Sequence, residues 1–150
     1  MVMPHAHSRL IVLGRYHAPA RTLPLPLVAA PISAGFPSGM DDFIERKLDL
    51  NELLIRHEAA TYFIRVQGDS MTGAGIHDGD ILIVDRAEEP RDGRIVIAVL
   101  NGELTVKRIR RRGGRLVLQA ENDHYPEIEV TPETSFEIWG VVRHVIHSLA

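Results

Sequence analysis

Cysteine is absent from this chain of 150 residues. Its absence excludes a disulfide scaffold, a thiolate nucleophile and any zinc or iron–sulfur site that needs cysteine ligands. It also suits a reducing compartment, so we expect a cytoplasmic protein. The length, the formal charge of −3 and the 45% of hydrophobic residues fit one soluble globular domain.

Long apolar runs are lacking as well. Arginine, glycine or proline interrupts the hydrophobic segments every few residues, so none approaches the ~20 residues that a membrane helix needs. The stretch from Leu10 to Leu13 is too short for the core of a signal peptide, and prolines follow it. We therefore expect no membrane association and no secretion.

Acidic residues are missing from the first 34 positions, which carry three arginines, whereas residues 35–150 carry 14 basic and 20 acidic residues. An acidic body repels the phosphate backbone, so direct DNA binding by the whole surface is not expected. One dense basic run remains, formed by Arg108, Arg110, Arg111, Arg112 and Arg115. Contact with DNA or an acidic partner is one interpretation of this run, and a solvated turn is the other.

Five of the nine prolines also fall within the first 34 residues. Proline lacks the backbone donor that a β-ladder needs, so residues 1–34 are expected to form an extended arm with at most short edge strands. Residues 35–150 then form the β-rich domain. At its start, Ser38 with Asp41 and Asp49 with Glu52 have capping-box spacing. Apolar positions at Phe43, Ile44, Leu48, Leu53 and Leu54 accompany them, which predicts one or two short helices.

From Thr61 onward the sequence predicts only strands and turns. Asn101-Gly102 and Gly113-Gly114 are strong hairpin signals, and they join runs rich in β-branched residues. The expected strands cover residues 62–66, 81–85, 94–100, 103–109, 116–120, 128–130 and 136–146. About seven strands at this spacing favour a mostly β protein with a small, highly curved, barrel-like fold.

Ser70 lies in the stretch Gln67-Gly68-Asp69-Ser70-Met71, between a predicted strand and a glycine-rich turn. A serine there is expected to be exposed at a strand end beside free backbone N–H groups. An acyl-transfer nucleophile with an oxyanion hole needs this arrangement. The alternative is an ordinary turn serine, because glycine, aspartate and serine are common in turns.

A nucleophilic serine needs a base, and Lys107 is a better candidate than any of the eight histidines. Alternation along the predicted strand puts Lys107 on the same face as Thr105 and Ile109. If that face is buried, desolvation lowers the lysine pKa, and a neutral Lys107 can accept the serine proton. The alternative is an exposed lysine on an edge strand.

Metal binding and other cofactors are not expected. His144 and His147 have a spacing that suits metal ligands on a helix. The run from Phe136 to Ile146 is predicted to be extended, however, and residues three apart on a strand point to opposite faces.

Three features combine into a more specific pattern. Gly68-Asp69-Ser70-Met71 is followed 37 residues later by Lys107, and Ala34-Gly35 lies 36 residues before the serine. Over about residues 32–148, the chain resembles the LexA/UmuD family of self-cleaving serine–lysine proteases. Further matching runs are Gly35-Phe36-Pro37-Ser38, Asp49-Leu50-Asn51, Gly79 to Asp85, Gly102 to Lys107 and Gly140-Val141-Val142.

The resemblance implies a LexA/signal-peptidase-like β-fold and assigns roles to particular residues. Ser70 would be the nucleophile, Lys107 the general base, and the peptide bond between Ala34 and Gly35 the substrate. By analogy, the backbone N–H groups of Asp69 and Ser70 would donate to the oxyanion. The arm would be cleaved within one chain or exchanged within a dimer.

The resemblance also implies partners. A RecA filament on single-stranded DNA would stimulate cleavage, and residues 35–150 would form a homodimer that joins a UmuC-like translesion DNA polymerase in error-prone repair. Residues 1–34 are too few for a DNA-binding domain, which favours the UmuD-like branch over a LexA-type regulator. Two alternatives stay open: a non-catalytic binding module for polymerase or RecA, and a protease that acts in trans on other proteins.

Overall fold

The computed structural model describes residues 9–19, 24–28 and 44–150. The expected cleavage site, Ala34-Gly35, and the expected cap at Ser38 and Asp41 lie outside the described residues. Within the described part of the chain, no helix is long and apolar enough to cross a membrane.

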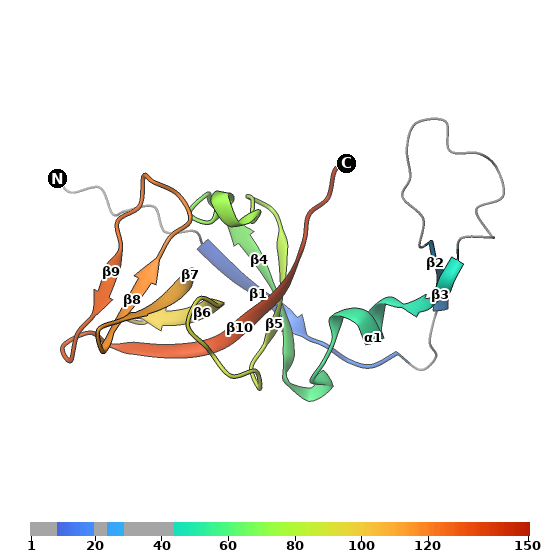
Figure 1. The fold of residues 1–150 in the computed structure, drawn as a ribbon, viewed down its shortest axis with the longest axis horizontal. Helices are drawn as coiled ribbons and strands as arrows, with labels where there is room; N and C mark the ends of the chain where they lie inside the picture. Colours follow the sequence, from blue (N-terminus) through green and yellow to red (C-terminus); the bar gives the residue numbers. More distant parts are fainter. Residues whose placement is uncertain (1–8, 20–23, 29–43) are drawn as a thin grey trace.

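Eight of the described strands form one curled antiparallel sheet in the order β1-β4-β5-β10-β6-β7-β8-β9 (Figure 1). Its strands are β1 (Arg9–Arg15), β4 (Thr61–Gln67), β5 (Ile81–Asp85), β6 (Ile95–Leu100), β7 (Glu103–Arg112), β8 (Arg115–Gln119), β9 (Ile128–Val130) and β10 (Phe136–Ile146). The register of β10 shifts twice, against β6 and against β5, and such irregularities bend a strand and increase its twist. The predicted mostly β, highly curved fold is confirmed.

A smaller two-stranded sheet pairs β2 (Pro24–Val28) with β3 (Ile44–Asp49), and the short helix α1 (Leu50–Leu54) follows. The side chain of Asp49 caps this helix by accepting a hydrogen bond from the backbone N–H of Asn51 at 2.9 Å. The predicted cap at Asp49 is confirmed. The predicted helical role of Ile44 and Leu48 is wrong, because their segment pairs with β2 and this tertiary pairing outweighs local propensity. Two single turns of 3₁₀-helix, η2 (Glu58–Ala60) and η3 (Thr72–Ala74), complete the elements of the described residues.

Both predicted hairpins are confirmed. Asn101 and Gly102 have φ values of 50° and 84°, and they join β6 to β7 with Leu100 paired to Glu103. Positive φ at both loop residues is the signature of a type I′ turn, which matches the twist of the strands. Gly113 and Gly114 make the equivalent connection between β7 and β8. These two turns place β7 in the interior of the sheet, between β6 and β8.

The core consists of two apolar clusters on the two faces of the sheet. Along β6, Val96 and Ala98 belong to one cluster and Ile97 to the other, and all three are fully buried. The middle of β6 is therefore covered on both of its faces. This arrangement determines the surroundings of Lys107 on the neighbouring strand β7.

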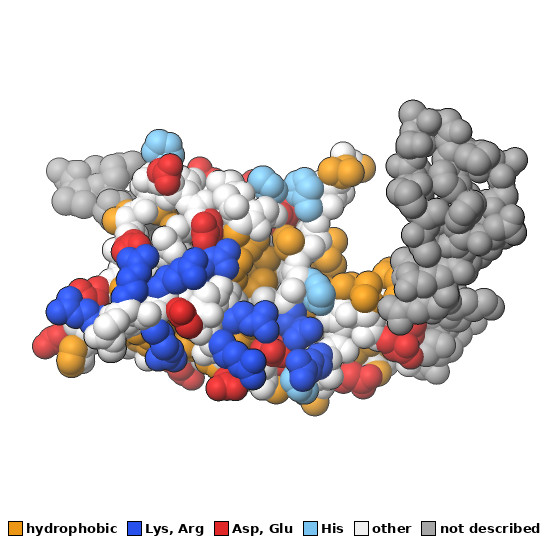
Figure 2. All heavy atoms as spheres, viewed as in Figure 1, with side chains coloured by type: hydrophobic (Ala, Val, Ile, Leu, Met, Phe, Trp, Pro, Cys, Tyr) orange, Lys and Arg blue, Asp and Glu red, His pale blue; other side chains and the backbone are white. Residues whose placement is uncertain are grey.

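The basic run on β7 and β8 is accompanied by acidic residues. Arg108 pairs with Glu121, and Arg112 lies 3.1 Å from a carboxylate oxygen of Glu127. Arg115 likewise lies 3.5 Å from Glu129. Figure 2 shows acidic side chains among the lysines and arginines on this face. The run is thus a mixed-charge surface, which is the arrangement expected of a solvated turn.

Candidate active site

Ser70 follows β4 in the segment from Gly68 to Gly75, which we name the Ser70 turn. Gly68 begins this turn with a φ of 114°, a value that favours glycine. The Ser70 side chain is 0% exposed, so the expectation of an exposed serine is wrong. Its burial has a structural cause in a loop about 50 residues later, where the backbone N–H of Glu121 donates to the carbonyl oxygen of Ser70 at 3.0 Å.

Residues 120–126, between β8 and β9, form the loop that covers the turn, and we name them the Tyr125 loop. The backbone N–H of Gly73 donates to the carbonyl oxygen of Glu121 at 2.7 Å. A Cβ atom added to Gly73 would lie at the same 2.7 Å from that oxygen. Gly73 therefore allows an approach between loop and turn that a larger residue would prevent.

Lys107 lies on β7 with its side chain 1% exposed. Its Nζ atom lies 3.3 Å from Ser70 Oγ and 3.2 Å from the carbonyl oxygen of Val106. The expectation that Lys107 faces the core is confirmed, and an exposed edge-strand lysine is excluded because β7 has neighbours on both sides. Burial lowers the pKa of Lys107 from 10.5 to about 8, because desolvation disfavours the ammonium form. At pH 7, roughly one such lysine in ten is neutral.

Tyr125 contacts both Lys107 and Asp69, the residue that precedes Ser70. Its hydroxyl donates to Asp69 Oδ1 at 2.5 Å, and its ring centroid lies 5.8 Å from Lys107 Nζ. Asn122 adds a second anchor, because its side-chain amide donates to the carbonyl oxygen of Asp69 at 2.8 Å. The hydrogen bond to Asp69 raises the pKa of Tyr125, because the protonated phenol donates that bond. The Tyr125 loop thus fixes the residue before Ser70 and covers the lysine.

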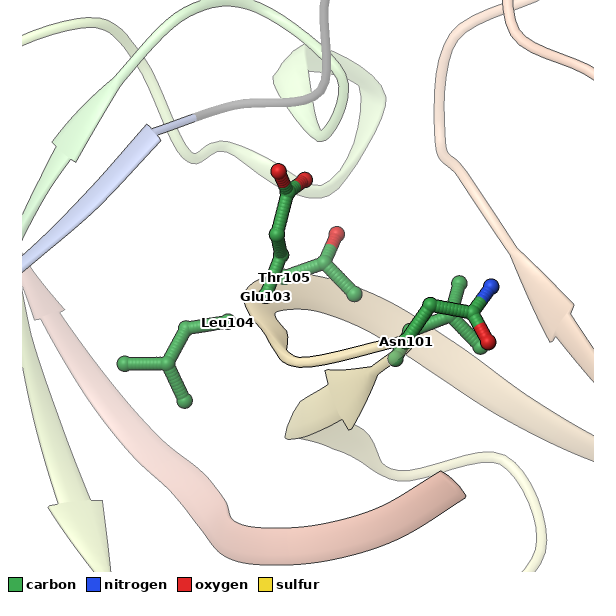
Figure 3. Close-up of a pocket in the computed structure, with 5 residues that line it drawn as sticks. Asn101, Glu103, Leu104 and Thr105 are labelled. Atoms are coloured by element: carbon green, nitrogen blue, oxygen red, sulfur yellow. The ribbon is translucent and has the colours of Figure 1, made fainter. Parts of the chain in front are cut away.

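Thr105, on the same strand as Lys107, is a further residue to which the sequence reasoning gave no functional role. It precedes Lys107 by two positions on the same face of β7, and its Oγ1 atom is buried without a hydrogen-bond partner among the described residues. A cavity of about 270 Å³ beside the β6–β7 turn is lined by Thr105 with Leu100, Asn101, Glu103 and Leu104 (Figure 3).

The described residues include one cluster with the composition of a metal site: His57, Asp85 and Glu88, whose ligand atoms lie within 4.8 Å of one another. The charges around it do not suit a cation, because the Glu88 carboxylate is shared by three guanidinium groups. These belong to Arg143 at 2.8 Å, Arg94 at 3.5 Å and Arg56 at 3.7 Å. Asp85 pairs with the first residue of β4, whereas Ser70 follows the last, so this cluster lies at the other end of the strand.

The Peptidase S24-like family model matches residues 26–143, which include Ser70, Lys107 and the Tyr125 loop. This match covers more than half of the chain. The chain belongs to the Peptidase S24-like family. The resemblance to self-cleaving serine proteases of the LexA/UmuD family is thereby confirmed.

Three relatives show the extent of the similarity to this S24 chain, and two of them match over most of their own length. Protein ImpA of Salmonella typhimurium is 46% identical over 137 residues, which cover 88% of this chain and 93% of ImpA. Protein MucA of Escherichia coli is 44% identical over 126 residues, which cover 83% of this chain and 86% of MucA. A LexA repressor from Paracidovorax citrulli is 40% identical over 126 residues, but the match covers only 55% of the repressor.

Proposed function

We propose that this S24 chain cleaves its own peptide bond between Ala34 and Gly35, with Ser70 as the nucleophile and Lys107 as the general base. The observation that carries the proposal is the distance of 3.3 Å between Lys107 Nζ and Ser70 Oγ in a buried setting. A lysine with a pKa of about 8 has a neutral fraction near physiological pH, which a general base requires.

The chemistry proceeds in two halves. Neutral Lys107 accepts the Ser70 hydroxyl proton while Oγ attacks the carbonyl carbon of Ala34. The backbone N–H groups of Asp69 and Ser70 donate to the developing oxyanion. The bond to the Gly35 nitrogen then breaks, and the Lys107 ammonium returns its proton to that leaving amine.

An ester between Ser70 and the Ala34 carbonyl remains after the first half. Neutral Lys107 next accepts a proton from water, whose oxygen attacks this ester. The bond between the carbonyl carbon and Oγ then breaks, and the Lys107 ammonium gives its proton to Ser70 Oγ, which regenerates the hydroxyl. The products are residues 1–34 with a new carboxylate and residues 35–150 with a new amine. No metal or redox partner enters this balance.

The Tyr125 loop supports this assignment through the residue that precedes Ser70. Tyr125 and Asn122 together hold the side chain and the carbonyl of Asp69, and a fixed Asp69 orients its own N–H group and that of Ser70. Such donors accelerate a reaction most when they are held in place before the charge develops. The same loop excludes water from Lys107, which keeps the lysine pKa low.

We further propose that cleavage is a damage-dependent switch. A tethered substrate needs no binding step, so control rests on whether the arm reaches Ser70. A RecA filament on single-stranded DNA favours that arrangement, and residues 35–150 then act in the cytoplasm as a homodimer with a UmuC-like translesion polymerase in SOS mutagenesis. Similarity to ImpA and MucA over most of their length supports this role over that of a LexA-type regulator.

The test is incubation of the purified chain with RecA, single-stranded DNA and an ATP analogue, followed by intact-mass spectrometry. We expect fragments 1–34 and 35–150 from the wild type and none from Ser70→Ala. Fragments with other boundaries would overturn the assignment of the Ala34–Gly35 bond. A wild type that stays intact would favour a non-catalytic module that binds polymerase or RecA.

A further inference from the structure

Strand β1 is part of the sheet, although it belongs to the segment that the proposed cleavage would sever. It pairs antiparallel with β4, from Arg9 opposite Gln67 to Arg15 opposite Tyr62 (Figure 1). Without β1, strand β4 would become the edge of the eight-stranded sheet. Such an edge presents a row of unpaired backbone donors and acceptors.

Two side chains anchor the ends of this strand pairing. Leu10 packs against the core cluster that contains Ile64 and Val66. Tyr16, just beyond β1, is 8% exposed, and its ring centroid lies 6.2 Å from that of Phe63. The backbone N–H of Tyr16 donates to the carbonyl oxygen of Thr61 at 2.7 Å.

The middle of β1 makes a different contribution. Ile11, Val12 and Leu13 are 42%, 43% and 47% exposed, so their side chains add less burial than the two anchors. Main-chain hydrogen bonds with selected side chains in pockets are the features of recognition by strand addition. The edge of β4 pairs with the main chain of β1, and Leu10 and Tyr16 supply the side-chain contacts.

We infer that the β4 edge is a strand-binding surface whose occupant is this chain's own segment Arg9–Tyr16, and that cleavage alone does not release that segment. The inference rests on the proposed Ala34–Gly35 scissile bond. Cutting that bond breaks none of the contacts between β1 and β4. It converts the strand from a tethered element, with a high effective concentration, into a ligand that dissociates and rebinds.

Release of the N-terminal fragment then depends on concentration and on competitors. A second extended strand with apolar residues at the positions of Leu10 and Tyr16 would displace the fragment and occupy the same edge. Before the fragment leaves, β4 is protected from unwanted strand pairing. In the cleaved protein, a strand from a partner can therefore replace β1 at the edge of β4.

The experiment uses the full-length Ser70→Ala chain with a recognition sequence for a site-specific protease inserted between Ala34 and Gly35. Because Ser70→Ala removes the proposed nucleophile, the cut does not depend on the proposed chemistry. After cutting at micromolar concentration, size-exclusion chromatography and intact-mass measurement report whether the two fragments co-elute. We expect the two fragments to co-elute. After Leu10→Ser, the N-terminal fragment should bind to residues 35–150 at least tenfold more weakly.

Ile11→Ser is the matched control, since Ile11 is the exposed neighbour of Leu10 on the same strand. It should retain the fragment as the unsubstituted strand does. A competition arm needs no substitution: excess peptide with the sequence of residues 9–19 should displace a labelled fragment, and a peptide of reversed sequence should not. The inference would be overturned if the unsubstituted N-terminal fragment dissociated immediately on cutting. It would also be overturned if Leu10→Ser and Ile11→Ser released the fragment equally. If the fragments co-elute in this experiment but the wild type does not cleave itself, the proposed function is overturned and the strand-binding inference stands.

Discussion

Lys107 Nζ lies 3.3 Å from Ser70 Oγ, although 37 positions separate the two residues in the chain. Two features of the fold bring them together. The Asn101-Gly102 hairpin fixes β7 against β6, so that Lys107 is buried within the sheet. The Tyr125 loop holds the Ser70 turn through hydrogen bonds to Ser70, Gly73 and Asp69.

Replacing Lys107 by methionine should stabilise the fold at neutral pH. Burial lowers the lysine pKa from 10.5 to about 8, and this difference corresponds to an upper limit of ~3 kcal/mol. Since the folded-state pKa is depressed, the penalty is complete below pH 8. Between pH 8 and 10.5 the unfolded chain still binds a proton that the folded chain has lost, so wild-type stability rises with pH.

The measurement is urea unfolding of Ser70→Ala and Ser70→Ala/Lys107→Met at about pH 7 and about pH 10. The first substitution prevents self-cleavage in both chains. We expect the methionine variant to be more stable by ~1–3 kcal/mol at pH 7 and to lose most of that advantage at pH 10. An advantage of equal size at both pH values would contradict a buried, pKa-shifted lysine.

Substitutions at Tyr125 should separate the covering of Lys107 from the anchoring of Asp69. Tyr125→Ala removes the ring above the ammonium and admits water, so the Lys107 pKa should rise from about 8 toward 10.5. The midpoint of the pH–rate profile for self-cleavage should move upward, with a rate at pH 7.5 lower by roughly tenfold.

Tyr125→Phe is the matched variant, since it keeps the ring and removes only the hydrogen bond to Asp69. Its pH midpoint should stay near that of the wild type, while its plateau rate should fall. A Tyr125→Ala profile that is lower at every pH but unshifted would show that the ring does not control the lysine pKa.

Gly73→Ala should disturb the contact between the Ser70 turn and the Tyr125 loop. The added methyl group would lie 2.7 Å from the backbone carbonyl oxygen of Glu121, so the loop must move. We expect stability to fall by ~1–3 kcal/mol and self-cleavage to slow at least tenfold. Thermal unfolding and cleavage rates test both effects, with the exposed Asp123→Ala of the same loop as a control that should change neither. Wild-type rates in Gly73→Ala would mean that the loop does not support the turn.

Local signals predicted the part of the fold that positions Lys107. Asn101-Gly102 and Gly113-Gly114 are short-range turn signals, and the alternation through Thr105, Lys107 and Ile109 indicates which residues share a face. Both depend on neighbouring residues alone, and the structure confirms them. Lys107 is buried because the face of β7 that it shares with Thr105 and Ile109 lies in the core.

Features that depend on distant pairing were not predictable in the same way. The segment Ile44–Asp49 has apolar spacing that suits a helix, yet it pairs with β2. Ser70 is buried because Glu121, some 50 residues later, folds over it. Tyr125 and Asn122 lie in a polar loop whose sequence does not indicate that Asp69 is their partner. Such contacts are set by tertiary structure, and a single sequence carries no local sign of them.

The central claim is that Ser70 and Lys107 together cleave the Ala34–Gly35 bond. The most direct test is intact-mass spectrometry of the wild type, Ser70→Ala and Lys107→Ala after incubation at about pH 10, where lysine is partly neutral without assistance. The account predicts fragments 1–34 and 35–150 from the wild type and neither from the two variants. Fragments of the same masses from Ser70→Ala, or an intact wild type at this pH, would contradict it.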